Sequence, residues 1–298
     1  MLSADNLTIG GDLGVKRLGY GAMQLTGTGV WGEYPDRNAA IALLRHVVDA
    51  GVTFIDTADA YGPHTNETLI HEALSPYPAD LVIATKGGFI RGGPGPTHYG
   101  AVGNREYLRQ CAYLSARRLG VDRIDLYYLH TGSATDVPFE EQIVTLAELR
   151  EEGLIRHIGL SNVSVEQLRA ARRIVEIVAV TAHYNVSDRT GAELLAEAEA
   201  AGIAFSPWHP TSVSDRGRNA THFADVLQPI ADRYGCTLPQ LAIAWLLHRS
   251  PVMLPIPGTS SQAHFDANLA AGDVRLTDDE VRVVTELVPE EATPLSDT

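Results

Sequence analysis

VTFIDTADAYG, residues 52–62, is a nearly continuous apolar run that changes abruptly into polar and aromatic residues. Apolar character without alternation is typical of a parallel strand that is covered on both faces. The polar residues after it would then lie at the carboxyl end of a strand, which is where a (β/α)8 barrel forms its active site. The stretch therefore predicts both a class of fold and a place for chemistry.

The same pattern recurs along the chain, where each short apolar run is followed by a stretch with helical spacing. The expected strands are Leu18–Ala22, Val52–Thr57, Leu81–Thr85, Ile124–Leu129, Ile155–Leu160, Val178–Ala182, Ile203–Ser206 and Val252–Ile256. The expected helices are 38–50, 66–74, 105–119, 139–152, 165–176, 192–201, 223–248 (broken at Gly235 and Pro239) and a last helix after Leu276. Eight alternations favour an α/β fold of the closed (β/α)8 TIM barrel type over an open doubly wound sheet.

Three smaller features complete the expected fold. GGDLG at residues 10–14 predicts a short N-terminal β-hairpin that plugs the bottom of the barrel. Capping boxes are expected at 164–167 and 277–280, where a Ser or Thr precedes a Gln or Glu by three residues. Residues 87–103 are rich in Gly and Pro and are expected to form a mobile loop above the barrel mouth rather than a regular element. We expect residues 1–298 to form a single barrel domain.

The composition excludes several classes of function. The chain has 298 residues, of which 23 are basic and 37 acidic, and the formal net charge is −14. This charge argues against binding to nucleic acids or to anionic membranes. Two cysteines cannot form a disulfide framework or a zinc cluster of four cysteines. No signal peptide or membrane-spanning run is visible, so a soluble cytoplasmic protein is expected. The oligomeric state is left open.

Four residues that follow three consecutive predicted strands form a proton-handling set. Asp56 and Tyr61 follow the second strand, Lys86 ends the third and His130 ends the fourth. Each alone has a structural explanation, such as capping or packing, but together they predict a functional cluster. A lysine ammonium stabilises a phenolate and lowers the pKa of the tyrosine, and a carboxylate keeps the buried lysine charged. A histidine can orient a carbonyl oxygen. The set predicts a site that protonates an oxygen and needs an external hydride source.

The chain resembles the aldo-keto reductases over essentially its whole length. The blocks that carry the resemblance, in chain order, are RLGYGAMQL, FIDTADAYG, VIATKGG, IDLYYLH, IRHIGLSN and LPIPGTSSQAHFDANL. The resemblance implies a barrel that reduces a small-molecule carbonyl substrate with a nicotinamide cofactor. It is closest to the pyridoxal reductase (pyridoxine 4-dehydrogenase) types. It also implies that Tyr61 is the general acid, that Asp56 and Lys86 tune it, and that His130 orients the substrate.

The resemblance further implies a cofactor site along the strand ends. Its expected members are Gly21, Met23, Ser161, Asn162, Thr181, Trp208, Gly258, Thr259, Ser260, His264 and Asn268. Ser161 and Asn162 would hold the nicotinamide carboxamide. Trp208 would stack on the nicotinamide ring, with Phe205 as the second choice. Thr259 and Ser260 would supply backbone and hydroxyl donors to the adenosine 2′-phosphate or its neighbours.

The sequence departs from the family pattern at four positions of this site. Thr181 replaces the usual glutamine, and Gly258 and His264 stand where many members have a lysine and an arginine. Ala267 replaces the glutamate before the adenine-contacting Asn268. NADP(H) is still the preferred cofactor, with NAD(H) left open.

Loop residues with rings predict the substrate side of the site. Trp31, His64 and His209 are the expected substrate contacts. Further rim candidates are Tyr34, His98, Tyr99 and His222. An aromatic rim with imidazoles suits a planar heteroaromatic aldehyde such as pyridoxal, and it suits an aryl ketone or a keto-sugar equally well. A ketoreductase of a natural-product or keto-sugar pathway is therefore the alternative.

Two other classes of function fit the sequence less well. A barrel that retains the cofactor could serve as a redox-sensing binding module, but the intact set of four catalytic candidates disfavours this. A metal-dependent hydrolase would need clustered ligands, typically a His-X-His pair at the end of the first strand. The sequence has no such pair there, so no metal site is predicted.

Overall fold

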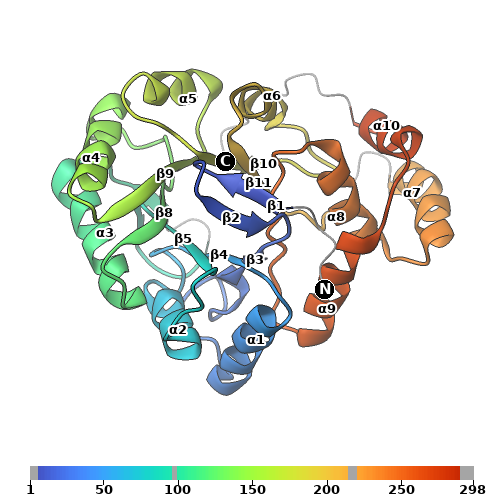
Figure 1. The fold of residues 1–298 in the computed structure, drawn as a ribbon, viewed down its shortest axis with the longest axis horizontal. Coiled ribbons are helices and arrows are strands. Elements are labelled where there is room, and N and C mark those ends of the chain that lie inside the picture. The colour runs from blue at the N-terminus through green and yellow to red at the C-terminus, as the bar shows by residue number, and fades with distance from the viewer. Residues whose placement is uncertain (1–5, 96–98, 214–219, 289–298) are drawn as a thin grey trace.

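The computed structural model describes residues 6–95, 99–213 and 220–288. Seven strands within these residues form one parallel sheet that curves into a barrel (Figure 1). In spatial order they are β3 (Tyr20–Gly21), β4 (Phe54–Asp56), β5 (Val82–Gly87), β8 (Ile124–Leu129), β9 (Ile155–Ser161), β10 (Ala179–His183) and β11 (Ala204–Trp208). Spatial order follows chain order, as in a (β/α)8 barrel. The predicted fold class is confirmed.

The eighth predicted strand closes the barrel without forming a regular strand. Backbone hydrogen bonds of 2.8 Å join Phe205 to Val252 and to Leu254, and one of 2.9 Å joins Gly19 to the carbonyl of Pro255. The segment therefore lies between β11, the last strand of the sheet, and Gly19, which directly precedes β3, the first strand. Its pairing is limited to an isolated bridge because a proline has no N–H to donate to a ladder.

Helices surround the sheet on its outer face (Figure 1). The α-helices are α1 (Arg37–Asp49), α2 (Thr65–Leu74), α3 (Arg105–Leu119), α4 (Phe139–Glu151), α5 (Val165–Arg172), α6 (Ala192–Ala201), α7 (Ala220–Tyr234), α8 (Leu238–Arg249), α9 (Gln262–Ala270) and α10 (Asp278–Glu286). Two 3-10 helices are η1 (Ala22–Gln24) and η3 (Ala271–Asp273). Both predicted capping boxes are present, at Ser164 before α5 and at Thr277 before α10.

Two helix predictions were wrong. The helix α9 was not expected, although Ser261 caps it by accepting the backbone N–H of His264. The helix α5 ends at Arg172, four residues before its predicted end. It ends early because Ile177 and Val178 must enter the core ahead of β10, where both are almost completely buried.

The predicted N-terminal hairpin covers the bottom of the barrel. The strand β1 (Asn6–Ile9) pairs antiparallel with β2 (Leu13–Lys16). Side chains of the hairpin, including Ile9 and Leu13, share a core cluster with barrel residues such as Phe54. The hairpin crosses the centre of the barrel in Figure 1. Because the hairpin covers one end of the barrel, a site can form only at the other end, where the carboxyl ends of the strands lie.

Residues 87–103 are not wholly irregular, contrary to expectation. They contain β6 (Phe89–Arg91) and β7 (Tyr99–Ala101), which pair antiparallel. The rings of Phe89 and Tyr99 lie 5.3 Å apart, centroid to centroid. Cross-strand aromatic pairing of this kind stabilises a hairpin, and here it outweighs the high Gly and Pro content. The hairpin follows β5 directly and so stands beside the barrel mouth.

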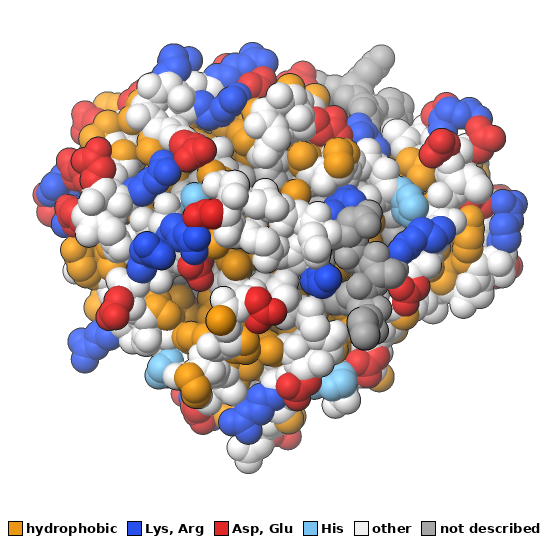
Figure 2. Space-filling model, in the orientation of Figure 1, with side chains coloured by type: hydrophobic (Ala, Val, Ile, Leu, Met, Phe, Trp, Pro, Cys, Tyr) orange, Lys and Arg blue, Asp and Glu red, His pale blue; other side chains and the backbone are white. Residues whose placement is uncertain are grey.

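Charged side chains are interspersed over the face seen in Figure 2, where Lys and Arg side chains lie among Asp and Glu. Many of them pair between neighbouring helices. Examples are Arg109 with Glu152, and Arg169 with Glu197. None of the helices in the described ranges is both long enough and apolar enough to cross a membrane.

Candidate active site

The four predicted catalytic residues meet at the carboxyl ends of neighbouring strands. Asp56 is the last residue of β4, Lys86 lies near the end of β5, and His130 directly follows β8. Tyr61 lies in the loop between β4 and α2. Because β4, β5 and β8 are hydrogen-bonded neighbours, residues far apart in sequence come within contact distance here.

Lys86 is the centre of the set. Its ammonium nitrogen donates to Asp56 Oδ1 at 2.5 Å, to the Thr57 carbonyl at 2.9 Å and to the Tyr61 hydroxyl at 3.5 Å. These three acceptors match the three hydrogens of an ammonium group. The side chains of Lys86 and Asp56 are almost completely buried. Burial lowers the pKa of Lys86, but the Asp56 carboxylate and Tyr61 offset this, and the net pKa is raised. Lys86 is therefore a fixed buried cation.

Tyr61 differs in one respect from the prediction. Burial raises the pKa of the Tyr61 phenol, and the nearby Lys86 charge opposes this without reversing it. The net pKa is above the ordinary value rather than below it, as the sequence had suggested. The phenol therefore keeps its proton at neutral pH. Lys86 is placed to stabilise the phenolate only when that proton leaves.

His130 faces Tyr61 from the other side. Their ring centroids are 6.0 Å apart and the rings are nearly perpendicular. Burial, followed by the charge of Lys86, lowers the pKa of His130 well below the usual value. The imidazole is therefore neutral and can donate one ring N–H while its other nitrogen accepts. Its Nδ1 atom is buried and has no hydrogen-bond partner among the described residues.

Residues at the ends of β9, β10 and β11 form the predicted nicotinamide side. Asn162 has φ +55°, and its side-chain amide donates to the His130 carbonyl at 3.2 Å. The indole Nε1–H of Trp208 donates to the Thr181 hydroxyl at 2.7 Å. The threonine that replaces the usual glutamine thus holds the tryptophan. Ser161, beside Asn162, is fully buried.

Of the two aromatic candidates for stacking, only Trp208 lies at the mouth. Phe205 is fully buried and belongs to the core cluster between sheet and helices. Its ring contacts that of Tyr184, with centroids 6.1 Å apart. Trp208 ends β11 and is partly exposed. The second choice, Phe205, faces away from the mouth.

Two glycines predicted to contact the cofactor have a structural reason of their own. A Cβ atom on Gly21 would lie 2.7 Å from the carbonyl oxygen of Ile256, and one on Gly258 would lie 2.6 Å from the carbonyl oxygen of Gly21. Real Cβ atoms essentially never come so close to backbone. Glycine at both positions therefore allows the first strand and the closing segment to approach each other.

The remaining cofactor candidates lie around the start of α9. The Tyr20 hydroxyl donates to the Thr259 carbonyl at 2.6 Å, which fixes the turn before the helix. Ser260 and His264 are exposed, and Asn268 is partly exposed on α9. Met23 lies in η1 and is also partly exposed. The hydroxyls and backbone N–H groups of this turn stand at a helix N-terminus, which favours a phosphate group.

The expected substrate residues are dispersed around the mouth. Trp31 is 36% exposed, His64 is exposed with φ +72°, and His209 is exposed with φ +49°. The ring of His209 lies 5.3 Å from that of His183, centroid to centroid. Tyr99 lies on β7. His98 and the side chain of His222 lie outside the described residues.

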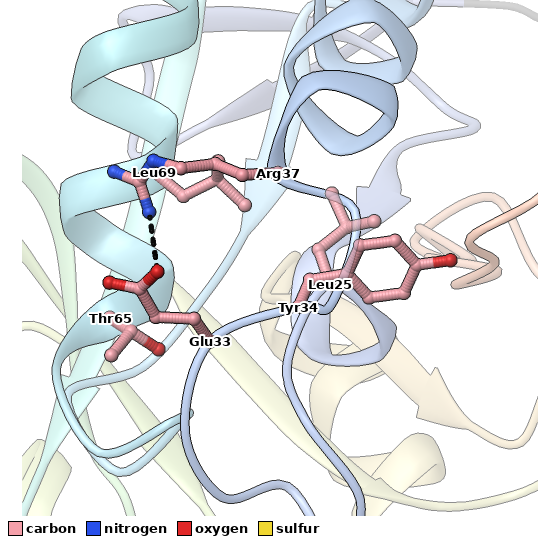
Figure 3. A pocket seen from close by; sticks show the side chains of 6 residues that line it. All are labelled: Leu25, Glu33, Tyr34, Arg37, Thr65 and Leu69. Carbon is pink, nitrogen blue, oxygen red and sulfur yellow. Dashed lines mark ion pairs between the residues drawn. The ribbon is translucent and has the colours of Figure 1, made fainter.

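Tyr34 lies in a small side pocket rather than with the predicted catalytic set. The residues that line this pocket, shown in Figure 3, are Leu25, Glu33, Tyr34, Arg37, Thr65 and Leu69. An ion pair of 3.5 Å between Arg37 and Glu33 crosses it. The pocket contains none of the four predicted catalytic residues.

Two residues at the mouth were missed by the sequence reasoning. The Phe89 ring lies 4.5 Å from the His130 ring, and Arg91 donates to backbone carbonyls in two loops. Both are in the hairpin that was expected to be irregular. Their Phe-Ile-Arg run lies between two pairs of glycines, which favoured a loop over a strand. Among the described residues, no group of three or more His, Cys, Asp or Glu could hold a metal ion.

Known proteins resemble this chain over almost its whole length. The model of the Aldo/keto reductase family matches residues 17–289. The chain is 40% identical to pyridoxine 4-dehydrogenase of Escherichia coli over 93% of this chain and 96% of that protein. It is 42% identical to an uncharacterised oxidoreductase of Schizosaccharomyces pombe over 90% and 85% of the two chains. An aldo-keto reductase from Klebsiella pneumoniae, solved in complex with NADPH, superposes with a TM-score of 0.81 at 25% identity and covers 99% of each chain.

Proposed function

This chain belongs to the aldo/keto reductase family, and from that premise we propose that it reduces the carbonyl group of a pyridoxal-like aldehyde with NADPH. The family carries out NADP(H)-dependent carbonyl reduction, and the overall similarity spans almost the whole chain. What we propose beyond the family is the identity of the catalytic residues and of the substrate class.

One observation carries the proposal. The buried ammonium group of Lys86 lies between Asp56, at 2.5 Å, and the hydroxyl of Tyr61, at 3.5 Å. A buried cation beside a protonated phenol favours transfer of the phenol proton to an oxygen on which negative charge develops. A purely structural salt bridge would not require a phenol at the mouth of the barrel.

Each side chain of the set has a distinct part in this proposal. Tyr61 donates its proton to the carbonyl oxygen, and Lys86 stabilises the phenolate that remains. Asp56 keeps Lys86 charged despite its burial. His130, neutral and perpendicular to Tyr61, donates a ring N–H to the same oxygen and orients it. The proton on Tyr61 is then restored from solvent.

The residues at the strand ends fit a nicotinamide dinucleotide. Thr259 and Ser260 precede the N-terminus of α9, where hydroxyl and backbone N–H groups favour a phosphate. Asn162 and the indole of Trp208 offer an amide and an aromatic face at the other side of the mouth. When bound, the cofactor supplies the hydride that the protein side chains cannot.

The pyridoxal-like substrate rests on two further points. A relative at 40% identity is a pyridoxine 4-dehydrogenase. Phe89 adds aromatic surface beside His130, and Trp208 adds a partly exposed ring at the end of β11; both suit a flat heteroaromatic ring. An aryl ketone or a keto-sugar is the alternative that the experiment must separate.

The test is to follow the absorbance of the reduced nicotinamide with NADPH and NADH against pyridoxal, aryl aldehydes, keto-sugars and 1,2-dicarbonyls. We expect the highest kcat/KM with NADPH and pyridoxal or a close heteroaromatic aldehyde. A preference for keto-sugars would support the alternative substrate class. Tight NADPH binding with no turnover of any carbonyl would contradict reduction and favour a redox-sensing role.

A further inference from the structure

Arg91, on β6, joins two loops at the barrel mouth to its own hairpin. Its guanidinium donates to the carbonyl of Val30 at 3.0 Å, to that of Ala60 at 2.9 Å and to that of Gly29 at 3.0 Å. Ala60 directly precedes Tyr61 in the chain. One side chain therefore ties the loop before α1 and the loop of the proposed proton donor to the hairpin that follows β5.

The same guanidinium lies over two aromatic rings. Its central carbon is 4.0 Å from the centroid of the Tyr99 ring and 5.6 Å from that of Trp31. It also donates to the Tyr99 hydroxyl at 2.8 Å. A planar guanidinium can stack on rings and donate in its own plane at once, which a lysine cannot do.

These contacts continue as a row to the proposed catalytic residues. The Tyr99 ring lies 5.3 Å from Phe89, Phe89 lies 4.5 Å from His130, and His130 lies 6.0 Å from Tyr61, all between ring centroids. We call Trp31, Arg91, Tyr99, Phe89 and His130 the aromatic row. Its contacts lead from Trp31 to His130, which faces Tyr61, and Arg91 is the link that attaches Trp31 to the rest.

The loop that carries Trp31 is held in a strained conformation. Val30 has φ +56°, a region that β-branched residues rarely adopt. Its carbonyl accepts from Arg91 and from the backbone N–H of Gly62 at 3.2 Å. Gly62 in turn accepts from Gly32 at 2.8 Å. Strain of this kind persists only where the surroundings impose it, and such positions concentrate at functional sites.

We propose that Arg91 is a positioning residue that fixes Trp31 and the loop of Tyr61 relative to each other, so that the aromatic row accepts the flat part of an aromatic carbonyl substrate. The proposal rests on the proposed function, because it assigns the substrate side of the same site. It predicts selectivity for aromatic over small aliphatic aldehydes, and it makes Arg91 the source of that selectivity rather than of the chemistry.

The test compares Arg91→Met and Arg91→Lys with the wild-type enzyme. The readout is the ratio of kcat/KM for an aryl aldehyde to that for propanal, because this ratio does not depend on the fraction of active enzyme. We expect Arg91→Met to lower the ratio roughly tenfold to a hundredfold, since small misplacements of a binding group cost that much. Arg91→Lys should restore little, because one ammonium cannot reach all these acceptors. Arg109→Met, on the outer helix α3, is the matched control and should leave the ratio unchanged.

Two further measurements separate this proposal from the proposed function. Trp31→Ala should lower the ratio as Arg91→Met does, and the double variant should be no worse than either single variant. Acrylamide quenching of Trp31, taken as the difference from Trp31→Phe in the same background, should rise in Arg91→Met. An unchanged ratio or unchanged quenching would overturn the role of Arg91. A wild-type enzyme that reduces no carbonyl would contradict the proposed function, and quenching would still decide whether Arg91 holds Trp31.

Discussion

The ammonium nitrogen of Lys86 lies 2.5 Å from Oδ1 of Asp56, and the two side chains are only 3% and 5% exposed. A buried pair of this kind is costly to form, because both charges leave water. Replacing it by apolar residues would often stabilise a protein, so stability alone does not explain it. The pair is explained if the lysine must carry a fixed charge beside the Tyr61 hydroxyl, 3.5 Å away.

The first prediction concerns the proton donor. Tyr61→Phe removes the phenol oxygen and leaves the ring, the buried ion pair and the cofactor candidates in place. We expect NADPH to bind with nearly unchanged affinity, while kcat for aldehyde reduction falls by roughly 10²–10⁴-fold, the usual contribution of a general acid. Stopped-flow turnover and a fluorescence titration with NADPH measure the two quantities. Near-normal turnover would remove Tyr61 from the mechanism.

The second prediction concerns the partner of Lys86. In Asp56→Asn the carboxylate that raises the pKa of Lys86 is gone, and burial, which lowers it, prevails. The pKa of the lysine should then fall, and kcat should decline with rising pH relative to the wild-type enzyme. The sign follows because only the protonated amine stabilises a phenolate. Asp232→Asn, an exposed change on α7, is the control and should keep the wild-type pH profile. A flat ratio of the two profiles would count against the tuning role.

The barrel could be read from the sequence because its strands are short apolar runs with long helical stretches between them. The capping boxes at Ser164 and Thr277 were also local and were predicted correctly. The features that were predicted wrongly depend on contacts between residues that are distant in sequence. The pairing of β6 with β7 is stabilised by a ring contact between Phe89 and Tyr99, ten residues apart. The Gly- and Pro-rich composition of the segment gives no indication of this contact.

The candidate site was likewise predictable where it depends on strand ends and unpredictable where it depends on packing. Strand-end positions brought Asp56, Lys86 and His130 together, because neighbouring parallel strands end at one edge of the sheet. The net pKa of Tyr61 was predicted in the wrong direction, because its burial is a property of the packed fold. Arg91 was missed, since its acceptors are backbone carbonyls that have no signature in the sequence.

The third prediction concerns the choice of cofactor. His264 lies on the exposed side of α9, one turn from Ser260, at the position where many family members carry an arginine. His264→Arg adds a planar fork that can bind a phosphate with two donors. We expect the ratio of kcat/KM for NADPH to that for NADH to rise about tenfold, with kcat at saturating NADPH unchanged. His264→Ala is the companion variant. If neither change alters the ratio, residue 264 does not contact the 2′-phosphate.

The last prediction concerns Asp59, a buried carboxyl in the same loop as Tyr61. Its side chain is 2% exposed, and its Oδ1 atom has no hydrogen-bond partner among the described residues. Burial, followed by the charge of Glu67, raises the pKa of Asp59 to about 7. In the unfolded chain the pKa of an aspartate is about 3.9. The folded protein therefore holds a proton on Asp59 in a window of pH where the unfolded chain has lost it.

The sign of the pH dependence follows from this difference in bound protons. Between about pH 4 and pH 7 the native state binds one proton more than the unfolded state, so the contribution of Asp59 to stability decreases as pH rises. At about 1.4 kcal/mol per pH unit, the loss amounts to roughly 4 kcal/mol over the window. Asp59→Asn cannot titrate, so its free energy of unfolding relative to the wild-type protein should increase from pH 4.5 to pH 7.5 and level off above that. Urea denaturation at a series of pH values measures the difference. Asp232→Asn should show no such slope, and a wild-type curve parallel to that of Asp59→Asn would mean that Asp59 is already ionised in the folded protein.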